Sequence, residues 1–186
     1  MESIARGELD GARSAARVLV QIDDADVLPR WRPDIEGIAA TAYEIQHAAD
    51  LVGAARGAAI LSVRCANCHA ASNARIAFAT DPAPADGPSG IEEMRTHQWA
   101  ATQMWQGLIA HANVPWRTGA LALIRAPISV APQGGVPVVA DDIDDVERVR
   151  FYGHRALAAT SLGDRAELYG SLLATCAHCH ATLKAR

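Results

Sequence analysis

The sequence predicts an all-α protein, and three features support that fold class. Half of the residues are hydrophobic but only 5% are aromatic, and alanine, which favours helices and lets them pack closely, is abundant. Apolar residues recur three or four positions apart through most of the chain, which is the spacing of one helix face. Proline and glycine are concentrated in residues 76–90 and 131–137, which we expect to be loops.

The first part of the chain predicts three helices. The segment after Met1 is polar and amphipathic, and Pro33 suits the first turn of the next helix, where a missing N–H breaks no helical hydrogen bond. An apolar stripe follows at helical spacing: Ile35, Ile38, Ala42, Ile45, Ala49 and Val52. The expected helices are Ser3–Gln21, Pro33–Ala49 and Leu51–Ala70.

The second part predicts four helices. The acidic residues at 141–145 lie at the start of the third of these helices, where they complement the positive end of its dipole, and a cation site there is the less favoured interpretation. That helix carries a stripe of Val146, Val149, Gly153, Ala156 and Thr160. The expected helices are Ile91–Ala112, Pro115–Ala126, Ile143–Thr160 and Leu162–Lys184.

Two pentapeptides, CANCH at 65–69 and CAHCH at 176–180, use all four cysteines of the chain. C-x-x-C-H is the pattern of covalent c-type haem attachment, in which two thiols add to the haem vinyl groups and the histidine binds the iron. On a helix, positions i, i+3 and i+4 share one face, so each triplet can reach the same porphyrin. We therefore expect two haem c groups. The attachment residues are Cys65, Cys68, Cys176 and Cys179, and the proximal ligands are His69 and His180.

Other chemistry remains open for these cysteines. A thioredoxin-like dithiol usually opens a helix after a strand, whereas both motifs here lie in helical Ala/Leu-rich sequence. One zinc ion held by both pairs satisfies the ligand count, and an exported chain can form disulfides. Neither alternative explains the histidine that follows each pair, so haem is the preferred interpretation.

The sequence separation from Cys65 to Cys176, here called the repeat offset, also relates other positions of the chain. The matching pairs are Ile35-Glu36 with Val146-Glu147, Leu51 with Leu162, Ala55 with Ala166, and Leu61 with Leu172. This predicts a duplicated helical-bundle module that ends in a haem-bearing helix. We expect a first module at 1–75, a linker at 76–90 and a second module at 91–186.

These features resemble the class II cytochromes c, the cytochrome c′-like four-helix bundles. That family has C-x-x-C-H near the end of its fourth helix, followed by an aromatic and a basic residue; here Leu183 replaces the aromatic and Lys184 is kept. The first copy, with 70–73 after its histidine, departs further. In the second copy, residues 104–109 look like the end of the family's first helix. In the first copy, residues 6–12 resemble that same end of the first helix. The resemblance implies four helices in the second copy and three in the first, with a further helix expected upstream of Met1.

The resemblance also implies that the first helix supplies the residue on the distal side of the haem. Met94, His97 and Met104 share one face of the helix at 91–112. His97 is the leading sixth ligand of the second haem, with Met94 or Met104 as alternatives. His154 flanks its stripe and His47 points away from its own, so both are weaker candidates. None of these residues is a convincing sixth ligand for the first haem, and His178 is expected to point outward.

Charge and hydropathy restrict the partners and the compartment. A net charge of −4 argues against nucleic acid, and no apolar run approaches the roughly 20 residues that span a bilayer. Covalent haem attachment is expected outside the cytoplasmic membrane, where unprotected thiols oxidise. The residues after Met1 lack the apolar core of a secretory signal, so we expect a periplasmic protein whose leader is absent from this chain.

The leading functional hypothesis is an electron carrier, not an enzyme, that passes electrons between periplasmic redox partners through two haems. The alternative is a haem-based nitric oxide or carbon monoxide sensor, because class II relatives often leave the iron five-coordinate. A peroxidase-like activity ranks last, since no Arg/His pair can be assigned to an open distal pocket. A homodimer is plausible, because class II relatives commonly pair through helix faces.

Overall fold

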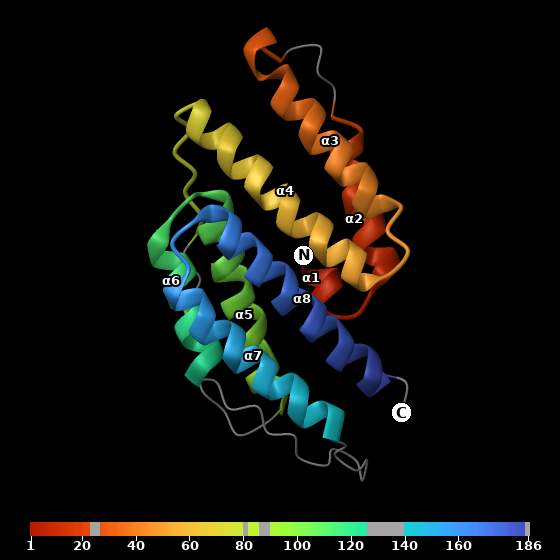
Figure 1. Cartoon of the computed structure of the whole chain (residues 1–186), viewed down its shortest axis with the longest axis vertical. Coiled ribbons are helices and arrows are strands. Elements are labelled where there is room, and N and C mark those ends of the chain that lie inside the picture. The colour runs from red at the N-terminus through yellow and green to blue at the C-terminus, as the bar shows by residue number, and fades with distance from the viewer. Residues whose placement is uncertain (23–26, 80–81, 86–89, 126–139, 185–186) are drawn as a thin grey trace.

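The computed structural model is all-helical, as the periodicity predicts, and it describes residues 1–22, 27–79, 82–85, 90–125 and 140–184 (Figure 1). Within these ranges there is no strand. The expected loop at 131–137 lies outside the described residues. The elements are α1 (Glu2–Ala5), α2 (Leu9–Val20), the 3₁₀ turn η1 (Pro29–Trp31), α3 (Arg32–Gln46), α4 (Leu51–Ala71), α5 (Gly90–Ile109), α6 (Asn113–Arg125), α7 (Ala140–Ala158) and α8 (Leu162–Lys184).

The expected single helix at Ser3–Gln21 is wrong, because the chain divides there into α1 and α2. Gly7 lies between them with φ of +71°, a left-handed conformation that glycine adopts without strain and that ends a helix. A Cβ atom at Gly7 would lie 3.2 Å from the carbonyl oxygen of Ala177 in α8. The break therefore lets the N-terminal turn pack closely on the helix that carries the second motif.

Helices α5 and α6 approach each other through glycines. A Cβ at Gly107 would lie 2.5 Å from the backbone nitrogen of Trp116, and one at Gly119 would lie 2.3 Å from the carbonyl oxygen of Ala100. The Trp116 side chain is fully buried, and its indole N–H donates to the carbonyl of Ala156 in α7 at 2.8 Å. This contact ties α7 to the same group of helices.

We expect Gly119→Ala to destabilise the protein by about 1–3 kcal/mol, because the new methyl meets backbone that cannot move without separating α5 from α6. Gly163→Ala is the matched control: the nearest atom to its Cβ is 3.9 Å away, so alanine should be neutral or stabilise α8 by up to about 1 kcal/mol. Urea unfolding of both variants checks this expectation. Equal stabilities would contradict the close α5–α6 contact.

Helices α4 and α8 pack against each other and run in opposite directions (Figure 1). Small residues meet at this contact, since a Cβ at Gly170 would lie 3.1 Å from the Cβ of Ala59. His69 comes ten residues after Ala59, and His180 comes ten residues after Gly170. At 1.5 Å per residue these histidines are separated by about 30 Å along the helix pair. Each motif is at the C-terminal end of its own helix, so the two motifs lie at opposite ends of the antiparallel α4–α8 pair.

The hydropathy of the sequence predicts no membrane-spanning segment. Among the residues that the structure describes, no helix combines the length and the apolar character needed to cross a bilayer.

Candidate haem-attachment sites

The second motif lies in the last turns of α8, between α7 and α5. Burial raises the pKa of the Cys176 thiol to about 12, and the nearby Cys179 and Asp145 add to the rise, so the thiol is protonated at neutral pH. None of the four cysteines forms a disulfide. Cys176 and Cys179 lie on one side of the helix, as attachment to a single haem requires.

His97 of α5 lies near this motif and has an unusual environment. Its Nε2 is buried and has no hydrogen-bond partner. Burial lowers the pKa of His97 to about 4; Glu93 opposes the shift, while His180 and Arg150 add to it. The imidazole is therefore neutral at pH 7, which is the form that binds metals, and its nitrogen lacks the partner that a buried polar atom normally has.

The other candidates for the second distal position are less favourably placed. Met94 is half-buried one turn before His97. Met104 is fully buried two turns after His97, where its side chain packs against Gly119 of α6. His154 is exposed on α7. Of the sequence-predicted distal residues, His97 is the one whose nitrogen is buried near His180.

The first motif lies in the last turns of α4, near the end of α5. The Nδ1 atom of His69 is 2.8 Å from the carbonyl oxygen of Ile109. A carbonyl only accepts, so Nδ1 carries the proton and Nε2 keeps its lone pair. Histidines that bind metals usually have such a backbone partner on the other nitrogen, because it fixes the ring and raises its basicity. His69 is therefore prepared for the role of a proximal ligand.

Burial raises the pKa of both thiols at this first motif. For Cys65 the neighbouring Cys68 adds to the effect, and for Cys68 the addition comes from Asp34 at the start of α3. Both thiols are half-buried. Asp34 thus lies near the first attachment site.

The structure brings no sequence-predicted distal residue to the first motif within the described ranges. His47 follows the end of α3, where its ring is exposed and its Nδ1 lies 2.9 Å from the carbonyl of Tyr43. That position precedes the start of α4, whereas His69 is in the last turn of that helix, about 27 Å along the axis from Leu51. His47 therefore does not lie opposite His69.

The residues of both motifs fit a covalent haem better than a shared zinc ion. Each triplet shares one helix face, His69 has a fixed free nitrogen, and a neutral, unpartnered imidazole lies near His180. One tetrahedral ion cannot be reached by cysteine pairs at opposite ends of α4 and α8. Within the described residues, no three His, Cys, Asp or Glu side chains converge to form a site for a bare metal ion.

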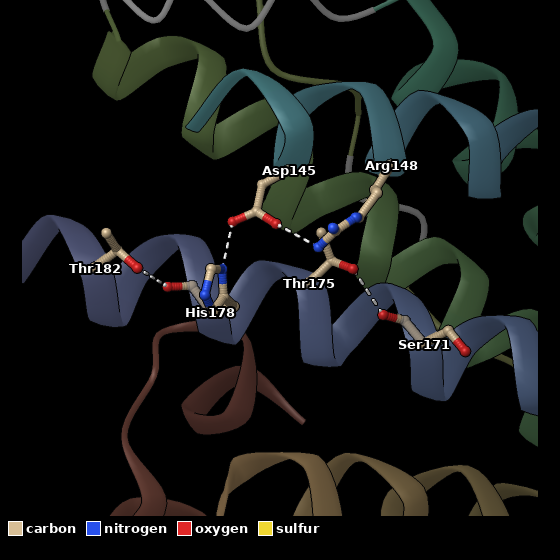
Figure 2. Close-up of polar contacts among 6 residues, drawn as sticks. All are labelled: Asp145, Arg148, Ser171, Thr175, His178 and Thr182. Carbon is tan, nitrogen blue, oxygen red and sulfur yellow. Dashed lines mark hydrogen bonds and ion pairs between the residues drawn. The ribbon is translucent and has the colours of Figure 1, made fainter. Parts of the chain in front are cut away.

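Sequence reasoning missed a polar cluster beside the second motif, which Figure 2 shows. Asp145 of α7 is buried, with 3% of its side chain exposed, and its two oxygens lie 2.7 Å from Nδ1 of His178 and 3.4 Å from a guanidinium nitrogen of Arg148. His178 remains 58% exposed, as its expected outward position requires, but Asp145 holds its ring. The sequence indicates only a helix-dipole role for Asp145, because it does not reveal which α7 residue meets α8.

A surface groove of about 510 Å³ lies beside the same cluster, between α4, α7 and α8. Val52, Arg56, Tyr152 and His178 are among the residues that line it, and none of the four cysteines is among them. The groove therefore does not correspond to either attachment site.

No protein-family model, no curated protein and no solved structure matches this chain.

Proposed function

We propose that this protein is a dihaem c-type cytochrome that carries electrons between periplasmic redox partners. Cys65, Cys68 and His69 would hold one haem, and Cys176, Cys179 and His180 the other. A bound haem supplies one-electron chemistry at its iron, and the protein sets the potential through ligands, burial and nearby charge. The compartment follows from covalent haem attachment, which is expected outside the cytoplasmic membrane.

The two haem helices begin in the same way, which supports a duplicated module. The side chain of Asp50 accepts from the backbone N–H of Gly53 at 2.7 Å, and that of Ser161 accepts from Asp164 at 3.0 Å. Both are side-chain caps of a helix N-terminus, and they are related by the repeat offset that relates the motifs. Buried positions also repeat at this offset: Ile38 with Val149, Ile45 with Ala156, Leu61 with Leu172, and Ala66 with Ala177.

The contact between α4 and α8 gives further support. Ala59 and Gly170, which meet in this contact, are themselves related by the repeat offset. Antiparallel helices that meet at equivalent residues have the arrangement of an isologous, two-fold interface. The proposed modules would thus be related as two subunits of a symmetric dimer, with one haem at each end. Each proposed haem would then lie at its own end of the helix pair, where it can exchange an electron with a redox partner.

The observation that carries the proposal is the buried, unpartnered Nε2 of His97 beside the C-x-x-C-H histidine His180. Leaving such a nitrogen unsatisfied costs about 1–3 kcal/mol, and a sixth iron ligand is a role that would use it. His97 lies on α5, the helix expected to supply the distal residue. A haem with two histidine ligands transfers electrons without offering an open site to a substrate.

The intact, matured protein tests the proposal directly. We expect its mass to exceed that of the polypeptide by two haem groups, and its reduced and oxidised spectra to contain a low-spin component from the second haem. A colourless sample, or a mass with fewer than two groups, would remove the proposed function.

A second candidate function is binding of nitric oxide or carbon monoxide at the first haem. It is favoured by the placement of His47 before the start of α4, whereas His69 lies in the last turn of that helix, about 27 Å along the axis from Leu51. The first motif is thus without any of the sequence-predicted distal ligands in the described structure. Addition of carbon monoxide to the reduced protein separates the two functions. A high-spin haem that binds the gas supports this candidate, and two unaffected low-spin haems support electron transfer alone.

A further inference from the structure

Equivalent carboxylates lie beside the two proposed haems, and their surroundings differ. Asp34 and Asp145 are related by the same repeat offset as the motifs. Asp34 raises the pKa of Cys68, and Asp145 raises that of Cys176, so each carboxylate lies near the attachment residues of its own motif. This match makes the two sites comparable position by position.

The carboxylate at the second site is shielded from water. Only 3% of the Asp145 side chain is exposed, and its carboxylate lies 2.7 Å from Nδ1 of His178 (Figure 2). His178 stands between the two cysteines of the motif in the sequence. Thr182 and Thr175 donate to the α8 carbonyls of His178 and Ser171 at 2.9 and 3.0 Å in the same part of the helix. The contact with His178 thus holds the Asp145 side chain beside the helix that carries the second motif.

The first site lacks this arrangement. Asn67 occupies the position equivalent to His178 and is exposed, and Asp34 is only half-buried. Water screens a half-buried charge far more effectively than a buried one, because the effective dielectric constant falls with burial. Asp34 should therefore act on its haem more weakly than Asp145 does.

The arginines near the second motif are exposed to solvent. Arg148 lies 3.4 Å from Asp145 with 57% of its side chain exposed, and Arg150, which acts on the pKa of His97, is also exposed. Exposed ion pairs are screened by solvent and contribute little. A second carboxylate, that of Glu93, is buried near His97. The second motif thus has a buried carboxylate beside it, whereas the equivalent carboxylate at the first motif is half-buried.

A ferric haem carries one more positive charge than a ferrous haem, so a fixed negative charge nearby favours the oxidised state and lowers the reduction potential. We propose that buried Asp145 makes the second haem the lower-potential centre, so that the first haem is the one reduced preferentially at equilibrium. This inference rests on the proposed function and adds to it a difference in potential between the two haems.

The test is a redox titration of the intact dihaem protein and its variants. Asp145→Asn should raise the lower of the two midpoints, with a gain of about threefold in the equilibrium constant for reduction, about 28 mV for one electron. Asp145→Glu keeps the charge and should leave that midpoint close to its original value. Asp34→Asn is the matched change at the first site and should move the other midpoint by a smaller amount. A variant with Cys65→Ala and Cys68→Ala identifies which midpoint belongs to the second haem.

The sign of the shift separates charge from structure. If Asp145→Asn merely loosened the α7–α8 contact, water would reach the haem and favour the more highly charged ferric state, which lowers the midpoint. An unmoved or lowered midpoint, a changed low-spin spectrum, or an equal response to Asp34→Asn would overturn the inference. These results all require two bound haems, whereas a sample without covalent haem would contradict the proposed function before any titration.

Discussion

A variant with Cys176 and Cys179 both changed to alanine is expected to carry one covalent haem where the parent protein carries two. Thioether bonds need the cysteine sulfurs, and the second motif has no other cysteine in reach, because the first pair lies at the opposite end of the α4–α8 contact. Alanine suits the helix, so α8 should persist. Intact mass after maturation, with haem staining of the denatured protein, measures the loss.

The reciprocal variant, with Cys65 and Cys68 changed to alanine, is the control. It should also retain one haem, but a different one, with the spectrum of the site near His97. Retention of two groups in either variant would exclude covalent attachment through that motif. Loss of both groups in either variant would mean that the two attachment sites are not independent.

Changing His97 to alanine is expected to convert one of the two haems from a low-spin form to a high-spin form that binds carbon monoxide. His97 is the sequence-predicted distal residue with a buried, unpartnered nitrogen, and its low pKa, about 4 because of burial, keeps it neutral at physiological pH. Removing it leaves the iron without that sixth ligand. Absorption spectra of the reduced protein with and without carbon monoxide report the change, and one haem out of two should respond.

Two comparisons sharpen this test. His154→Ala removes an exposed histidine of α7 and should leave the spectra as they are. Added imidazole should restore the low-spin spectrum of the His97→Ala protein by occupying the vacated position. If the His97→Ala spectra match those of the parent, His97 is not a ligand, and Met94 becomes the next residue to change.

Most helix bounds follow from local sequence. The helix predicted at Leu162–Lys184 has those ends in the structure, because Ser161 caps it and the apolar positions recur at helical spacing. The prediction of one helix at Ser3–Gln21 is wrong because Gly7, which a helix can tolerate, instead ends one here. Its contact with the backbone of Ala177 is a tertiary interaction, and no local pattern reveals it.

For the candidate sites too, some features follow from local sequence and others from contacts between helices. The three residues of each motif share one helix face because of their spacing in the sequence alone, as in Cys65, Cys68 and His69. Of the surroundings, the family resemblance predicts only His97 for the distal side of the second haem. The bond of His69 to Ile109 and the contact of Asp145 with His178 each join different helices and were not predictable.

The sequence by itself determined that this chain forms helices and that two of them carry C-x-x-C-H on one face, since the period of a helix is a property of neighbouring residues. Only the tertiary structure decided which residues face those motifs. The register between helices depends on where small side chains allow close approach, as Gly170 does against Ala59 and Gly119 against Ala100. Shape complementarity of that kind arises between segments distant in the chain, so it becomes visible only when they are packed together.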